Sequence, residues 1–187
     1  MAQATAKKPP AWTFETLAQL TREELDALFR ALPAPAIGDM DGEFISALPG
    51  YSNAEWRSTM ASLGKDYWLG KSYKPEAFGG HAGHGLNRYR TKAGDVRRLS
   101  RFVWNIAPST VDDRPSLVMH YSAFPNWGGG LDLIDEIRVA ASGVYLGLFH
   151  TAKPVPGFTP RDGGDRSGIE FFFLSGPVSA FVEAEQD

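Results

Sequence analysis

The sequence contains no cysteine in its 187 residues, so the protein has no disulfide bond and no thiolate nucleophile. Zinc and iron–sulfur centres with cysteine ligands are excluded for the same reason. No run of about 18 apolar residues occurs, which predicts that the chain has no membrane-spanning helix and no membrane partner. The first ten residues lack the apolar stretch of a secretory signal, so we expect the protein in the cytoplasm.

The sequence also lacks an excess of positive charge. Its 19 Lys and Arg residues and 22 Asp and Glu residues leave a net charge of −3, which argues against nucleic acid as a partner. The common phosphate-binding motifs are missing, and Gly128-Gly129-Gly130 precedes a predicted strand rather than a helix. His81 and His84 have no third ligand nearby in the sequence. We therefore expect no cofactor and no metal ion.

Aromatic residues and glycines, by contrast, are abundant. Aromatics make up 12% of the chain and there are 20 glycines, a composition typical of twisted β-sheet with tight turns. With 43% hydrophobic and 22% charged residues, the chain has an ordinary globular composition, and its length suits one domain. We expect a flexible tail over residues 1–12 and a single domain over residues 13–187.

Helical patterning is confined to the N-terminal third of the chain. Thr21 and Glu24 form a capping-box pattern, which predicts a helix over residues 22–31 that two following prolines end. The spacing of apolar residues predicts a shorter helix over 14–20 and another over 53–60. The apolar stripe of the first two helices must pack against another element, and the remaining sequence supplies a sheet.

After residue 64 the apolar residues alternate with a period of two, as in β-strands. Short strands joined by short turns form antiparallel sheets, and closing about eight strands into a barrel removes the exposed edges. We predict a mainly β fold, an antiparallel up-and-down β-barrel covered by the N-terminal helical segment. The irregular stretch 154–167 is interpreted as a surface loop or as a flap over the barrel mouth. The predicted strands are 67–74, 84–91, 97–106, 116–122, 131–139, 144–150 and 169–174, with 42–48 as a weaker candidate.

One predicted strand carries a carboxylate on an apolar face, because Asp135 alternates with Leu133 and Ile137. A carboxylate in such a position is costly unless it is paired or faces a ligand. Two interpretations follow. Asp135 forms a buried ion pair with an arginine on an adjacent strand, or it acts as a general acid or base.

Other polar residues in the predicted strands are candidates for the same site. Tyr121 and His120 are consecutive, so only one of them can point into the barrel, where it would polarise a carbonyl or relay a proton beside Asp135. Simple alternation places Trp68 and Lys71 on opposite faces of their strand. Lys71 either extends to water or, pointed inward, offers a positive handle for a carboxylate or carbonyl group.

Several short motifs resemble a known family. They are Met40-Asp41-Gly42, the W-x-G-K-x-aromatic strand from Trp68 to Tyr73, and the segment from Asp135 to Arg138 followed by Tyr145-Leu146-Gly147. In this order they resemble the GXWXG family of small bacterial lipocalin-like proteins, which belong to the calycin-type barrels. At the place of the family's name motif, residues 42–46, Phe44 stands where the family has tryptophan. The resemblance implies a β-barrel with a closing helix and a small-molecule cavity, and it implies no catalytic residue.

An eight-stranded barrel can hold one small ligand, so the leading hypothesis is a carrier or sensor of a small hydrophobic or aromatic molecule. The alternative is an isomerase, cyclase or hydratase that uses acid and base residues in the same cavity without a cofactor. A third hypothesis is an interaction protein that self-associates, for example as a homodimer. The candidate catalytic residues are Asp135, Tyr121 and His120. The expected ligand-binding residues are Trp68, Lys71, Tyr73, Trp104, Arg138 and Tyr145.

Overall fold

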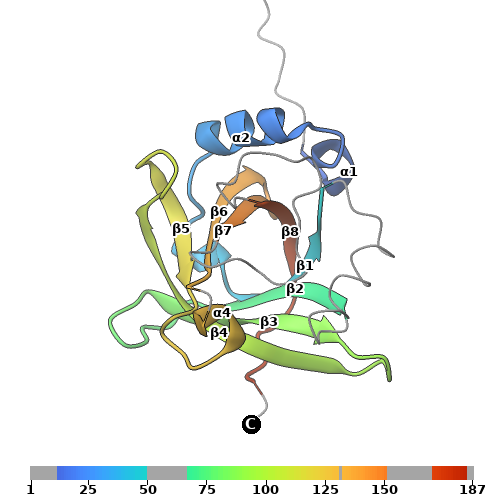
Figure 1. Ribbon diagram of the computed structural model, residues 1–187, viewed down its shortest axis with the longest axis vertical. Coiled ribbons are helices and arrows are strands. Elements are labelled where there is room, and N and C mark those ends of the chain that lie inside the picture. The colour runs from blue at the N-terminus through green and yellow to red at the C-terminus, as the bar shows by residue number, and fades with distance from the viewer. Residues whose placement is uncertain (1–11, 50–66, 131, 151–169, 185–187) are drawn as a thin grey trace, which may run out of the picture.

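The computed structural model of the protein describes residues 12–49, 67–130, 132–150 and 170–184 (Figure 1). In these residues eight strands form a closed barrel in which every strand is antiparallel to its sequence neighbours and β1 pairs with β8. The predicted mainly β fold and the up-and-down barrel are confirmed. The helix expected over 53–60, the loop over 154–167 and most of the expected tail lie outside the described residues.

The strand boundaries follow the sequence alternation closely, and β2 and β7 begin and end where they were predicted. The strand β6 begins after a one-turn helix, α4 (Trp127–Gly130), where the sequence predicted only a break. The strand β8 continues past the predicted end at Leu174. The strands are β1 (Gly42–Ala47), β2 (Tyr67–Lys74), β3 (Gly83–Arg90), β4 (Val96–Pro108), β5 (Pro115–His120), β6 (Ile134–Ala141), β7 (Val144–His150) and β8 (Glu170–Ser179).

Aromatic side chains line the barrel interior, where glycines on neighbouring strands leave room for them. A Cβ atom at Gly85 would lie 2.6 Å from the ring of Phe102, and one at Gly147 would lie 2.3 Å from the ring of Phe172. These glycines therefore let the rings lie directly over the inner sheet surface. The buried interior residues include Phe44, Trp68, Tyr73, Tyr89, Phe102, Trp104, Leu117, Met119, Tyr121, Ile137, Tyr145, Phe172 and Leu174.

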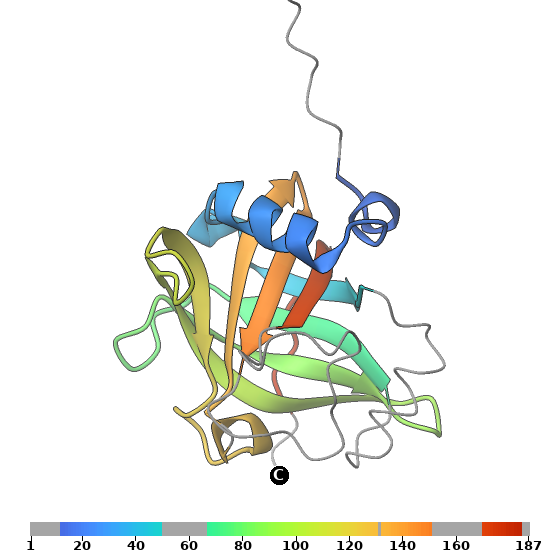
Figure 2. The ribbon, with the colours of Figure 1, turned by 45° about the horizontal axis from the view of Figure 1, so that its top comes forward.

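A second apolar cluster lies on the outer side of the barrel. The helix α2 (Arg22–Ala31) begins with the predicted capping box, in which Thr21 Oγ1 accepts a hydrogen bond from the backbone N–H of Glu24 at 3.2 Å. It lies across the outside of the barrel, with α1 (Phe14–Leu17) beside it and the short helix η1 (Ile37–Asp39) after it (Figure 2). Whether this segment shields the barrel as a whole stays a prediction. The buried residues of the outer cluster are Leu17, Leu25, Phe29, Leu146, Leu148, Phe171 and Phe173.

Arg138 joins α2 to the outer side of β6. Its guanidinium donates to the backbone carbonyl of Phe29 at 2.9 Å and to Asp112 Oδ2 at 2.7 Å, and it lies 4.5 Å from the centroid of the Phe29 ring. The hydrogen bond from Arg138 lowers the pKa of Asp112. Arg138, expected among the ligand-binding residues, thus lies outside the barrel and anchors a helix.

The contact between α2 and the barrel leads to a stability prediction. Phe29 is fully buried. Phe29→Ala is expected to lower the free energy of unfolding by about 3–5 kcal/mol, because it removes a buried ring and leaves a cavity. The control is Ile45→Ala, at a side chain that is 44% exposed, with an expected loss below about 0.5 kcal/mol. Urea unfolding measures both, and equal losses would show that α2 does not stabilise the barrel.

Candidate ligand-binding site

A buried lysine lies at the centre of the barrel interior. The side chain of Lys71 on β2 is 2% exposed, and its ammonium group forms an ion pair with Asp135 on β6. It also donates to Tyr121 Oη at 2.6 Å and to Asn87 Oδ1 at 2.9 Å. An ammonium group has three donors, so all the hydrogen-bonding capacity of Lys71 is used.

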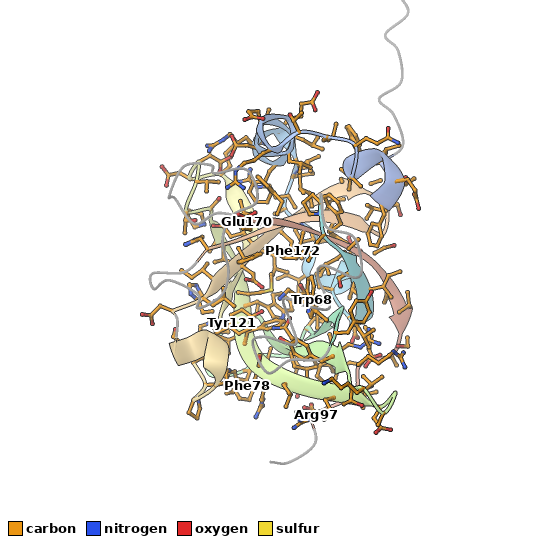
Figure 3. All side chains as sticks on the ribbon, turned by 45° about the vertical axis from the view of Figure 1, so that its right-hand side comes forward. Trp68, Phe78, Arg97, Tyr121, Glu170 and Phe172 are labelled. Atoms are coloured by element: carbon orange, nitrogen blue, oxygen red, sulfur yellow. The ribbon has the colours of Figure 1, made fainter. Side chains whose placement is uncertain are left out.

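Further hydrogen bonds, one of them from Trp68, complete this network. Tyr121 Oη donates to Asp135 Oδ2 at 2.8 Å and accepts from Asn87 Nδ2 at 3.0 Å. Trp68 Nε1 donates to Asn87 Oδ1 at 3.1 Å. Figure 3 shows Trp68 and Tyr121 in the barrel with Phe172 nearby. The five residues, Trp68, Lys71, Asn87, Tyr121 and Asp135, form the interior polar network.

A β-bulge explains how Trp68 and Lys71 both face inward. The register pairs Trp68 with Tyr89 but Gly70 with Arg88, so β2 holds one extra residue at this point. The extra residue reverses the alternation, and the expectation that Trp68 and Lys71 lie on opposite faces is wrong. Gly70 has φ +139°, and a Cβ atom there would lie 2.0 Å from the carbonyl oxygen of Phe44, so the position requires glycine.

The sequence identified Asp135 and Tyr121 but not the right partner for the carboxylate. The ion pair is formed with a lysine on β2, which is not a neighbour of β6, instead of with an arginine on an adjacent strand. His120 is the last residue of β5, and Tyr121, which follows it, belongs to the interior cluster. His120 therefore points to the outer side, and the structure does not bring it to the network.

Asn87 is the member of the network that the sequence analysis missed. It holds Lys71, Tyr121 and Trp68 together from β3. The sequence pattern of this strand could have identified Asn87, because Asn87 shares the inward face of the strand with two glycines and Tyr89. A polar residue on a face otherwise made of glycines and an aromatic residue marks a group with buried partners.

Three other expected ligand-binding residues lie in the same interior without joining the network. Tyr73 Oη contacts Met119 Sδ at 3.4 Å, and Trp104 Nε1 donates to the carbonyl of His84 at 3.1 Å. Tyr145 belongs to the same buried cluster. These side chains form the apolar walls around the polar centre.

The surroundings of Lys71 are aromatic and buried. Its Nζ lies 5.3 Å from the ring centroids of Phe102, Tyr121 and Phe172 and 5.4 Å from that of Trp68, within the range of cation–π interactions. Burial lowers the pKa of Lys71, and the negative charge of Asp135 opposes that shift. Burial, together with the nearby Asp135 charge, raises the pKa of Tyr121 well above its usual range. Tyr121 therefore keeps its proton at neutral pH and acts as a donor.

One atom of the network has no partner. Asp135 is 3% exposed, and its Oδ1 has no hydrogen-bond partner among the described residues. A buried carboxylate oxygen without a donor is costly, because burial removes its hydration. The donors of Lys71 and Tyr121 are directed elsewhere, so the open hydrogen-bonding capacity at this site is that of an acceptor.

The described residues offer neither a cluster of metal ligands nor a membrane-spanning helix. Across the described ranges, no three His, Asp or Glu side chains are grouped so that they could hold a metal ion. Within the same part of the chain, none of the helices combines the length and hydropathy needed to cross a bilayer.

Comparisons with known proteins support the fold alone. No model of a protein family matches the sequence, and no curated protein matches it. Among solved structures, a protein from Thermomonospora curvata is similar, with a TM-score of 0.53 and 15% sequence identity over 86% of this chain and 91% of that chain. At that identity the likeness is one of fold and carries no statement about function.

The coupling within the interior ion pair can be measured. Lys71→Met leaves a buried carboxylate without its cation, so we expect a loss of about 3–5 kcal/mol in the free energy of unfolding. When Lys71→Met is combined with Asp135→Asn, the loss is expected to fall short of the sum of the single losses by about 1–3 kcal/mol. The matched control is Lys74→Met on the same strand, where the side chain is 36% exposed. Additive losses in urea unfolding would contradict a coupled pair.

The buried tyrosines predict a loss of stability at high pH. Burial raises the pKa of Tyr89 to about 12, against an opposing hydrogen bond with Ser100. Between the usual pKa near 10 and this value the folded protein retains a proton that the unfolded chain has lost, so stability falls as the pH rises. Tyr89 alone accounts for up to about 3 kcal/mol of that fall. Between pH 9 and pH 12 the free energy of unfolding is expected to fall less in Tyr89→Phe than in the wild-type protein. Parallel curves of this free energy against pH would contradict the raised pKa of Tyr89.

Proposed function

We propose that the barrel binds a small aromatic or apolar molecule that carries one hydrogen-bond donor, and that this donor pairs with Asp135 Oδ1. The observation that carries the proposal is the buried oxygen without a partner, surrounded by aromatic side chains. An O–H or N–H group of a ligand would satisfy this oxygen, whereas a carboxylate at the same place would be repelled. The protein would thus be a carrier or sensor of an aromatic alcohol, phenol or amine.

The barrel architecture supports this proposal. Barrels of eight strands have an interior wide enough for side chains or for one small ligand. We assign the fold to the calycin type, in keeping with the W-x-G-K strand and its resemblance to the GXWXG family. In such a barrel the aromatic walls supply apolar contact area and a small number of polar groups fix the orientation of the ligand.

A second candidate function is a cofactor-independent enzyme, and one observation favours it. Lys71 and Tyr121 both donate to the same oxygen of Asp135, so a proton can move among three buried groups without reaching water. An isomerase or hydratase needs such a donor and acceptor next to its substrate. The carrier is preferred because the donors of Lys71 and Tyr121 are all used within the network, whereas Asp135 keeps an acceptor oxygen open.

The proposed function predicts selectivity for a hydroxyl group. We expect the protein to bind 2-naphthalenemethanol at least about tenfold more tightly than 2-methylnaphthalene, because a hydrogen bond to a charged acceptor contributes about 1.5–3 kcal/mol. In Asp135→Asn the preference is expected to shrink to about threefold or less. Quenching of tryptophan fluorescence reports binding, because Trp68 and Trp104 line the interior.

Two controls belong to this experiment. Asp112→Asn removes a carboxylate on the outer side of the barrel and is expected to leave the preference for the alcohol unchanged. Native mass spectrometry of freshly purified protein would show whether an aromatic alcohol or amine is retained during purification. Equal affinity of the wild-type protein for the alcohol and the hydrocarbon would overturn the proposed function.

A further inference from the structure

We infer that Lys71 forms a covalent imine with an aromatic aldehyde or ketone held in the barrel. This inference rests on the proposed function and names a second class of ligand for the same site. Among the described lysines, Lys71 alone is buried, whereas Lys74 is partly exposed and Lys92 is exposed. A primary amine enclosed by aromatic rings is suited to react with an aromatic carbonyl compound, because the rings hold the apolar part of the ligand beside the nitrogen.

The ion pair supplies the neutral amine that the reaction needs. An ammonium group has no lone pair, so it must lose a proton before it attacks a carbonyl carbon. The Asp135 carboxylate accepts that proton along the existing hydrogen bond, which leaves a neutral amine and a neutral acid. This transfer removes two opposite charges from a buried site at once, so it costs less there than it would in water. Burial lowers the pKa of Lys71 in the same direction.

The second oxygen of Asp135 is available for the next intermediate. Attack of Lys71 Nζ on the carbonyl carbon forms a C–N bond, and the carbonyl oxygen takes up the proton that the nitrogen gives up. The resulting carbinolamine carries its hydroxyl group one carbon away from the nitrogen. Asp135 Oδ2 is paired with Lys71 Nζ, whereas Asp135 Oδ1 is buried without a partner among the described residues. The hydroxyl group can therefore form a hydrogen bond with Oδ1. An aromatic alcohol binds at Oδ1 without a covalent bond for the same reason.

Loss of water completes a balanced reaction. The acid form of Asp135 returns its proton to the hydroxyl group, the C–O bond breaks, and water leaves. The nitrogen lone pair forms the C=N bond, which gives an iminium cation beside the restored carboxylate. One ammonium ion and one carbonyl compound have become one iminium ion and one water molecule, so no oxidant, reductant or metal is required. The positive charge stays among the same four aromatic rings.

Trapping with a reducing agent tests the inference. The full-length protein is incubated with 2-naphthaldehyde and sodium cyanoborohydride at pH 7, which converts an imine into a stable secondary amine. We expect one naphthylmethyl group per chain, located by peptide mapping at Lys71, at a rate at least tenfold above that at Lys74 or Lys92. Lys71→Arg keeps the positive charge and is expected to lose this fast labelling. Lys74→Arg is the matched control and is expected to keep it.

A competition experiment on the wild-type protein does not depend on how the variants fold. Excess 2-naphthalenemethanol is expected to slow labelling of Lys71 by the aldehyde and to leave labelling of Lys74 unchanged, because both ligands use Asp135 Oδ1. Asp135→Asn is expected to slow labelling of Lys71 at least tenfold, since the amide does not accept the proton. Labelling spread evenly over exposed lysines, in protein that still prefers the alcohol to the hydrocarbon, would overturn the imine and leave the proposed function standing. Labelling at Lys71 in protein that does not prefer the alcohol to the hydrocarbon would overturn the proposed function and leave the imine standing.

Discussion

The buried ion pair between Lys71 and Asp135 sets the requirements for the rest of the interior. Taking two charges out of water is expensive, and the cost is offset only when the pair is well oriented and its remaining donors are satisfied. Asn87 on β3 and Tyr121, which directly follows β5, meet that requirement. The pair thus links β2 with β6, which are not neighbours in the barrel. Few arrangements of the same strands would satisfy all these groups together.

The outer face of strand β6 carries a second buried charge. Asp135 points into the barrel, whereas Arg138 points outward and binds Asp112 and the carbonyl of Phe29. A buried charge on each face makes this strand intolerant of a shift in register, because a slip of one residue would exchange the two environments. The outer ion pair therefore helps to keep the inner one in place. The aromatic interior and the helix α2 are thus joined through one strand.

Much of this arrangement could be predicted from the sequence, and the failures have physical causes. The capping box at Thr21 and the alternation of the strands located α2 and the barrel, since both depend on local patterns. The same alternation identified Asp135, and it also places Arg138 on the opposite face, although Arg138 was expected inside. The bulge at Gly70 was missed because one inserted residue reverses the alternation, and a glycine within a strand was its only signal. The pairing of Lys71 with Asp135 depends on closure of the barrel, which no local pattern reveals.

Closure of the barrel also has a consequence for how the protein folds. The first and last strands meet at the seam, where Ser179 donates to Glu43 from 136 positions away along the chain. Contacts between residues so distant in the sequence form slowly, because the loop between their ends must first be ordered. Phe172, one of the rings around Lys71, lies on the last strand. Pairing of β8 with β1 therefore does more than close the sheet, because it also places one of the rings that enclose the charged pair.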